Sequence, residues 1–141
     1  MENFPIPTTD FVLRRKEELL LIKRNEGAYA GEWFVLGGRQ NRGEKMLDAV
    51  RRVADREVGL KPKDVEAILF SHCQDVFNPA STNSDGELPA WHSIWHFYLI
   101  EVSDSFEPQL DTTSSECMWF RVDDLPAIPD VVAEALMKAG L

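Results

Sequence analysis

Residues 37–60 read GGRQNRGEKMLDAVRRVADREVGL and combine a glycine turn with one amphipathic helix. The glycine pair at the start allows a close approach to the backbone and leaves main-chain carbonyls accessible to a hard cation. From about Lys45 to Val58, apolar residues recur at the spacing of an α-helix. Gly59 is expected to end this helix in a left-handed conformation. The stretch therefore predicts a tight turn that leads directly into a helix.

Glu57 breaks the pattern of this helix. On a helical wheel the apolar face is formed by Met46, Leu47, Val50, Val53 and Ala54. Glu57 falls on that face, between Val50 and Val53 in angle. A carboxylate is disfavoured there because it approaches an apolar surface and because the last turn of a helix favours cations. Either Glu57 turns to solvent at the helix end, or a positive ion or an arginine pairs with it.

Strands and a second helix are expected around this stretch. The expected strands span residues 10–15, 19–24, 32–36, 67–77, 91–102 and 118–122. The first two form a hairpin across the polar residues 16–18, and polar loops are expected at 78–90 and 103–115. Pro129 begins a final helix that runs to about Ala139. This order predicts one α+β domain over residues 1–141, with a mixed sheet packed between helices.

The composition excludes several classes of protein. A hydrophobic content of 44% with 28% charged residues is typical of a globular domain. The net charge of −9 and the lack of a basic run argue against a nucleic-acid surface, although a few arginines and a divalent cation can still bind a small phosphate compound. No apolar run approaches the roughly 18 residues of a membrane span, and no secretory signal is recognisable, so a cytoplasmic location is expected. Cys73 and Cys117 are predicted to be buried free thiols rather than a disulfide.

The spacing of residues 38–60 resembles the Nudix hydrolases. Their conserved box reads G-x5-E-x7-R-E-U-x-E-E-x-G-U, where U is apolar. The matching positions here are Gly38, Glu44, Arg52, Ala54, Glu57, Gly59 and Leu60. Two positions depart, since Val53 replaces the glutamate after the arginine and Arg56 replaces the first of the paired glutamates. The preceding strand and the ending around residues 119–126 also look Nudix-like. The resemblance therefore covers nearly the whole chain and implies the Nudix fold, an α/β/α sandwich.

The two departures indicate a reduced metal site. In the family, the box glutamates supply most ligands for one to three magnesium or manganese ions. Glu57 is the only glutamate of that cluster left in this chain. The GDP-mannose mannosyl hydrolases show the same pair of losses and work with a single magnesium ion. The segments 23–24 and 33–39 of this chain also resemble that branch.

The resemblance implies roles for six residues. Asp10 would contact the nucleotide or sugar, although it could instead only cap a strand. Arg24, Arg39 and Arg52 would hold the diphosphate and sugar, with solvated surface charge as the alternative for Arg24 and Arg52. The remaining two, the main-chain carbonyl of Gly37 and the carboxylate of Glu57, would be metal ligands.

One match to the mannosyl hydrolases fails. They use a histidine base before the last strand, and Ser114 stands at that place here. A serine hydroxyl does not accept a proton at neutral pH as an imidazole does. Glu116 is the substitute expected from sequence, as base or as an additional metal ligand, unless it is only an exposed loop acid. The three histidines are scattered along strands and are interpreted as structural.

The expected function is the Mg²⁺-dependent hydrolysis of a nucleoside diphosphate sugar such as GDP-mannose, with Mn²⁺ as a possible replacement. Water would attack either the anomeric carbon or phosphorus. The alternatives are a pyrophosphatase acting on ADP-ribose, dinucleotides or nucleoside triphosphates, and a domain that binds a nucleotide sugar without catalysis. Trp91 and Trp95 point the same way along a strand and either stack on the substrate or pack in the core or a dimer contact. A homodimer is expected from the resemblance alone.

Overall fold

The structure is a computed structural model that describes residues 4–25, 27, 29–77, 91–111 and 114–141. It contains seven strands, two α-helices and one short 3₁₀ turn. In chain order they are β1 (Ile6–Arg15), β2 (Glu18–Arg24), β3 (Trp33–Phe34), β4 (Leu36–Arg39), α1 (Met46–Val58), the 3₁₀ turn Pro62–Asp64, β5 (Val65–Phe77), β6 (His92–Val102), β7 (Ser114–Arg121) and α2 (Asp130–Lys138). The expected loop at 78–90 lies outside the described residues.

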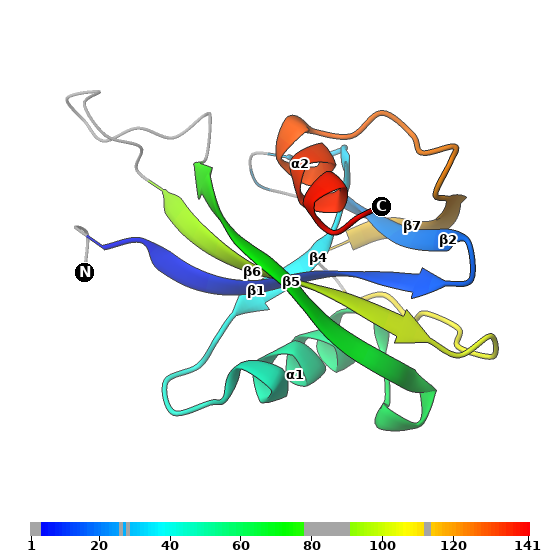
Figure 1. Ribbon diagram of the computed structural model, residues 1–141, viewed down its shortest axis with the longest axis horizontal. Coiled ribbons are helices and arrows are strands. Elements are labelled where there is room, and N and C mark those ends of the chain that lie inside the picture. The colour runs from blue at the N-terminus through cyan, green and yellow to red at the C-terminus, as the bar shows by residue number, and fades with distance from the viewer. Residues whose placement is uncertain (1–3, 26, 28, 78–90, 112–113) are drawn as a thin grey trace.

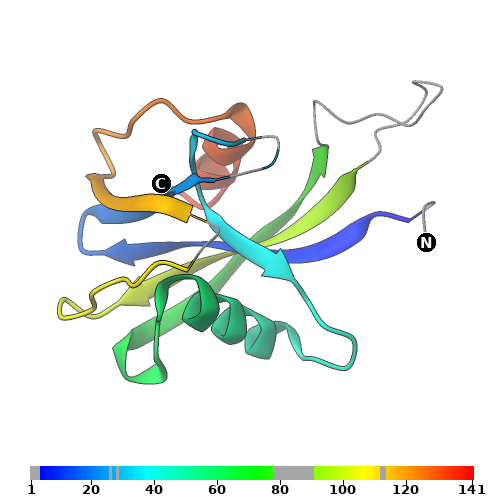
Figure 2. The same cartoon turned by 180° about the vertical axis from the view of Figure 1, so that it is seen from behind.

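The strands form one mixed sheet. Its main path is β3-β2-β1-β6-β5, while β4 pairs with β1 and β7 pairs with β2. β1 and β6 run parallel, and the other pairs are antiparallel. Figure 1 shows α1 and α2 on opposite sides of the sheet, and Figure 2 shows β4 and β7 from behind. The predicted α+β architecture, a mixed sheet between helices, is confirmed.

Alternation along the central strands produces two cores. In β1, Phe11 and Leu13 pack on the α1 side, whereas Val12 between them packs on the α2 side. All three side chains are fully buried. A strand covered on both faces is expected to read as a continuous apolar run, as residues 11–13 do. Each such side chain contributes roughly 1.5–3 kcal/mol through its burial, so the centre of the sheet is a rigid support for the segments at its rim.

Helix α1 has the predicted limits. Lys45 is its N-cap, and Gly59 ends it at a φ of 70°. The Gly59 N–H donates to the carbonyl of Asp55, and the next N–H donates to Ala54, which satisfies the last turn. Glu57 stays on the buried face of the helix, as the wheel predicted. The second helix begins one residue after Pro129, which acts as its N-cap.

Several strand limits differ from the predicted ones. The first strand starts at Ile6 because its early residues pair in parallel with β6. The last strand starts at Ser114 because β7 pairs with β2 as far as Arg24. The strand predicted at 32–36 is divided, since its first part pairs with β2 and its second part pairs with β1. These differences all come from pairing between distant segments.

Two further expectations concern the cysteines and membranes. Cys73 and Cys117 are free thiols, as predicted, but neither is fully buried. Cys73 is exposed on the edge strand β5, and Cys117 is partly buried on β7. Within the described residues, no helix is long and apolar enough to cross a membrane.

Candidate active site

The pairing of β1 with β4 places Asp10 directly opposite Gly37. A Cβ atom at Gly37 would lie only 2.7 Å from the Asp10 carboxyl carbon and closer still to Oδ2. Glycine is therefore required at position 37 by this close approach, and its backbone does not adopt a positive φ. The sequence predicted a turn at Gly37 and Gly38, but both lie within strand β4 because they pair with β1. This pairing brings the backbone against a buried carboxyl group.

Glu57 is buried and pairs with an arginine, which is the second of the two alternatives considered for it. The residue is 7% exposed, and Arg56 Nη2 donates to Glu57 Oε1 at 3.3 Å. Burial raises the pKa of Glu57 to about 7, against the lowering effect of Arg56 and Arg24, while Asp111 raises it further. The carboxyl group can therefore gain or lose a proton near neutral pH.

Asp10 is a second buried carboxyl group at this site. Burial raises the pKa of Asp10 to about 8, although Thr8 Oγ1 donates to its Oδ1 at 2.5 Å and lowers it. The charge of Glu57 also raises this pKa, and the charge of Arg24 lowers it. Since Arg24 acts on both carboxyl groups and Glu57 acts on Asp10, the residues Asp10, Arg24 and Glu57 form one electrostatic cluster.

Two adjoining hollows surround this cluster. The first, about 210 Å³, is charged, and it is lined by Ile22, Arg24, Val35, Gly37, Arg56, Glu57 and Ser114. The second, about 290 Å³, contains four aromatic rings beside one acidic and two basic side chains, and it is lined by Thr8, Asp10, Arg24, Gly27, Tyr29, Phe34, Gly37, Gly38, Arg39, Val76, Trp91, Ser93 and Trp95. Arg24 and Gly37 line both hollows. We call them the charged hollow and the aromatic hollow.

The two tryptophans behave differently in the aromatic hollow. Trp95 is 5% exposed and packs edge-on against Phe34, so it belongs mainly to the core on the α2 side. Trp91 is 36% exposed, and the Arg39 guanidinium lies 4.8 Å from its ring centroid. This is a cation–π contact that leaves the ring available to a ligand.

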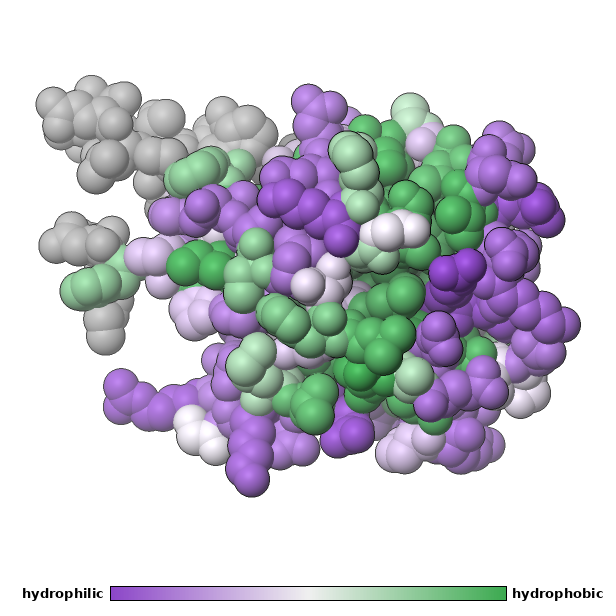
Figure 3. Space-filling view, in the orientation of Figure 1, coloured by the Kyte–Doolittle hydropathy of each residue, from purple (hydrophilic) through white to green (hydrophobic). Residues whose placement is uncertain are grey.

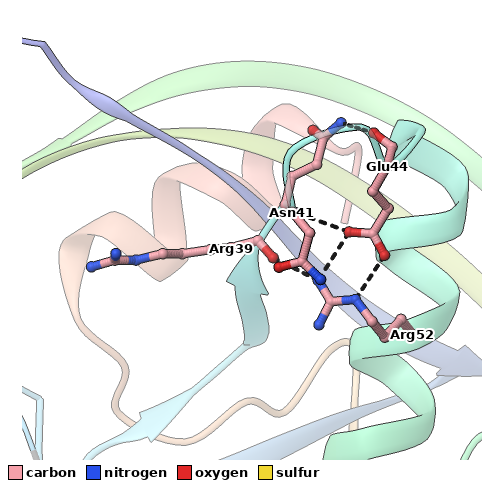
Figure 4. Close-up of polar contacts among 5 residues, drawn as sticks. Arg39, Asn41, Glu44 and Arg52 are labelled. Carbon is pink, nitrogen blue, oxygen red and sulfur yellow. Dashed lines mark hydrogen bonds and ion pairs between the residues drawn. The ribbon is translucent and has the colours of Figure 1, made fainter. Parts of the chain in front are cut away.

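Arg52 holds the segment between Arg39 and Glu44 in place. Among the described residues that line the two hollows, Arg52 is absent. Its Nε donates to Glu44 Oε2 at 2.7 Å, and its Nη2 donates to Glu44 Oε1 at 3.1 Å and to the Arg39 carbonyl at 2.7 Å. The Asn41 N–H also donates to Glu44, at 2.9 Å. Hydrogen bonding from Arg52 lowers the pKa of Glu44. Figure 4 shows the guanidinium of Arg39 directed away from this network while its carbonyl faces Arg52.

A β-bulge separates Ser114 from Glu116. Glu116 pairs with Lys23 and Ser114 pairs with Arg24, so β7 has one extra residue between them. Ser114 consequently faces the charged hollow. Glu116 alternates with Cys117, which packs on the α1 side, and therefore faces the other way, where Lys23 Nζ lies 3.2 Å from its carboxylate. The structure thus does not place Glu116 with Glu57, which differs from the expected role.

Each of the three histidines contacts other residues of the sheet. His72 contacts Ser71 and Gln74, His92 lies 2.9 Å from Asp75, and His96 Nδ1 lies 3.1 Å from the Thr8 carbonyl. Among the residues described, no imidazole lines either hollow.

The two hollows together bring in five residues that were predicted from the sequence to form the site, namely Asp10, Arg24, Gly37, Arg39 and Glu57. The hollows are also lined by residues that were not predicted to belong to the site, namely Arg56, Thr8 and Tyr29. Arg56 was visible only as a departure from a glutamate position.

Known proteins share the fold of this chain. The family model for the NUDIX domain matches residues 5–138. The chain is similar to the MutT NUDIX hydrolase from Burkholderia pseudomallei, with 25% identity, a TM-score of 0.78, and coverage of 96% of this chain and 98% of that one. The NUDIX domain of Shewanella oneidensis NrtR, solved with ADP ribose, has the same fold at 18% identity, with a TM-score of 0.73 and coverage of 98% and 88%.

One curated relative matches part of the chain. The low-salt glycan biosynthesis protein Agl8 of Haloferax volcanii is 41% identical over 76 residues. The match spans 52% of this chain and 48% of that relative, so it covers about half of the relative's length.

Proposed function

Because the chain belongs to the Nudix hydrolase family, whose domain model matches residues 5–138, we propose that it hydrolyses a nucleoside diphosphate joined to a sugar. The observation that carries this proposal is the pair of adjoining hollows that share Arg24 and Gly37. One hollow offers guanidinium groups and a carboxylate, and the other offers aromatic rings. A nucleotide sugar has the same two-part chemistry, a diphosphate joined to ring systems.

In the proposed complex the diphosphate lies in the charged hollow. Arg24 reaches both hollows and suits the junction between the diphosphate and the ring that follows it. A guanidinium group binds phosphate oxygens in pairs, which a lysine does not reproduce. A base or sugar ring then occupies the aromatic hollow, stacked on Trp91 beside Arg39.

A divalent metal ion fits the donor atoms of the charged hollow. The carboxylate of Glu57 and the main chain of Gly37 border the same space, and Mg²⁺ prefers oxygen donors of this kind. Within the described residues, no group of three or more His, Cys, Asp or Glu is placed to hold an ion. Mg²⁺ is commonly held by one or two carboxylates together with water and substrate phosphates, so this donor set suits one ion shared with the substrate. When bound, Mg²⁺ or Mn²⁺ would offset charge on the phosphate oxygens during attack by water.

The remaining residues position the substrate and manage protons. Asp10 is largely protonated at neutral pH and can donate a hydrogen bond to a substrate oxygen. Arg52 acts as a positioning residue in this scheme, since it fixes the Arg39 carbonyl and the turn that follows. Ser114 offers a hydroxyl to the charged hollow and no basic nitrogen.

The bond that is cleaved distinguishes two reactions. Attack at the anomeric carbon releases a nucleoside diphosphate and free sugar, whereas attack at phosphorus releases a nucleotide and a sugar phosphate. Ser114 at the charged hollow, with Glu116 on the other face of β7, favours attack at phosphorus as the second candidate. The NUDIX domain of NrtR, which has a similar fold, was solved with ADP ribose, a compound of the proposed substrate class, so ADP-ribose belongs among the substrates to be tested.

Product analysis in 18O-labelled water tests the proposal. Purified protein is incubated with GDP-mannose, ADP-ribose and other nucleotide sugars in the presence of Mg²⁺ or Mn²⁺, and the products are analysed by mass spectrometry. Label in the free sugar indicates attack at carbon, and label in a phosphate indicates attack at phosphorus. Absence of turnover across the panel would exclude this substrate class, and tight binding without turnover would then support a non-catalytic binding domain.

We also propose a homodimer formed along β5. This strand of 13 residues ends the main path of the sheet and contains neither proline nor lysine, which commonly protect exposed edges. Leu69 and Phe70 on it are 48% and 53% exposed. Figure 3 shows hydrophobic side chains gathered over the middle of the molecule in the view of Figure 1. Antiparallel pairing of two β5 strands about a two-fold axis would cover both edges. Light scattering after size exclusion should report twice the chain mass, and a monomer at micromolar concentration would refute this arrangement.

A further inference from the structure

Arg56 occupies an unusual position beside the buried carboxyl group of the charged hollow. It lies in the last turn of α1, one residue before Glu57, and its Nη2 donates to Glu57 Oε1 at 3.3 Å. The side chain of Arg56 is 51% exposed, whereas that of Glu57 is 9% exposed. Within the described part of the chain, Glu57 is the only hydrogen-bond partner of this guanidinium group. A guanidinium group has five N–H donors, so donors of Arg56 remain for a ligand in the hollow that it lines.

Gly38 provides the space in which Arg56 lies. A Cβ atom at Gly38 would be 2.8 Å from Arg56 Nη2 and 3.1 Å from Val53 Cγ2. Any larger residue at position 38 would push the guanidinium group away from the glycine turn. The chain therefore holds Arg56 between the turn and Glu57, and does not leave it on the outer surface of α1.

The lining of the charged hollow has the character of an anion site. Two guanidinium groups, Arg24 and Arg56, border it together with one carboxylate, and the rest of the lining is apolar or neutral. Asp111 acts on Glu57 electrostatically but does not line the hollow. Each guanidinium group can bind phosphate oxygens through two charge-assisted hydrogen bonds, so two of them at one hollow favour a phosphate ligand.

We propose that Arg56, together with Arg24, binds a phosphate group of the substrate directly. Arg56 is then a specificity-determining residue for diphosphate compounds, and its role goes beyond neutralising Glu57. The inference rests on the proposed function, because it names a residue that would bind the diphosphate of that substrate.

Equilibrium binding of inorganic diphosphate, measured by calorimetry in EDTA, tests this role without turnover or metal. Wild type is compared with Arg56→Ala, with Arg56→Lys and with Arg51→Ala, an exposed arginine on the same helix outside the charged hollow. Arg56→Ala should weaken binding about ten- to a hundredfold, the usual effect of losing a hydrogen bond to a charged group. Arg56→Lys should fall between wild type and the alanine variant. Arg51→Ala should bind as wild type does.

The variant Glu57→Gln separates direct binding from neutralisation of Glu57. If Arg56 binds phosphate, Arg56→Ala should weaken diphosphate binding in the Glu57→Gln background as well. If Arg56 only offsets the charge of Glu57, the loss should disappear in that background, and the proposal would be overturned. Wild type that does not bind diphosphate, or an equal loss in Arg51→Ala, would also overturn it. Failure of the nucleotide-sugar assay alone would leave these affinities unchanged, so the two proposals fail separately.

Discussion

Replacing Gly37 by alanine should destabilise the fold through one contact with Asp10. The new Cβ atom would lie 2.7 Å from the Asp10 carboxyl carbon, while an ordinary contact between carbons is about 3.5–4.0 Å. Asp10 is buried and hydrogen-bonded to Thr8, so its carboxyl group has little room to move aside. The substitution is therefore an overpacking mutation inside the rim of the sheet.

The expected cost follows from two opposing effects. Overpacking of a buried site costs about 1–3 kcal/mol. Because Gly37 does not have a positive φ, alanine would otherwise stabilise the chain by about 0.4–1 kcal/mol through the unfolded state. A net loss of about 1–2 kcal/mol is expected. In an Asp10→Ala background most of it should vanish, leaving only the 3.2 Å approach of the new Cβ to the Thr9 carbonyl.

Urea denaturation of the two single variants and the double variant measures this coupling. Gly38→Ala is the matched control, since its Cβ would meet Arg56 and Val53 instead of Asp10. Its cost should be the same with and without the Asp10 side chain. An equal cost of Gly37→Ala in both backgrounds would refute the reasoning, as would a variant as stable as wild type.

Three further predictions concern protonation, the turn and the carboxylate of the charged hollow. The pKa values of Asp10 and Glu57 are raised to about 8 and about 7, so between about pH 4 and pH 8 the folded state holds protons that the unfolded state has released. In EDTA the free energy of unfolding should therefore fall as the pH rises through this range. Asp10→Asn should reduce this fall by up to about 5 kcal/mol at pH 8. If the curves of wild type and Asp10→Asn against pH were parallel, the raised pKa of Asp10 would be contradicted. Arg52→Lys loses the paired contact with Glu44 and should speed amide exchange in residues 39–44 with little change in α1, a result that unaltered exchange would exclude. Glu57→Gln should lower turnover by about a hundredfold or more without loss of the folded state, because glutamine keeps the shape of the buried side chain but supplies no carboxylate. Wild-type turnover would remove Glu57 from the mechanism.

Much of the candidate site was predictable because its main signals are local. The wheel position of Glu57, the left-handed end at Gly59 and the limits of α1 depend on contacts three or four residues apart, which a sequence displays directly. The box spacing also placed Gly37, Arg39 and Arg52 in one turn-and-helix unit, and the structure keeps them there.

The partners of these residues depended on distant segments. The helix pattern indicates which face of α1 Arg52 lies on. It does not indicate that Glu44 and the Arg39 carbonyl accept hydrogen bonds from its guanidinium group. Glu116 was expected to replace the missing base or to bind metal because it lies two residues after Ser114 in the sequence. The bulge between the two residues turns Glu116 to the other face of β7, and it exists only because β7 pairs with β2.

The sequence by itself determined the amphipathic helix and the placement of a carboxylate on its buried face. These follow from side-chain periodicity within one segment. Only the tertiary structure decided that the Gly37–Gly38 pair belongs to a strand, that Asp10 lies over Gly37 and that Arg24 joins the two hollows. The physical reason is that strand register and bulges are set by hydrogen bonds between segments far apart in the chain, which no local pattern encodes.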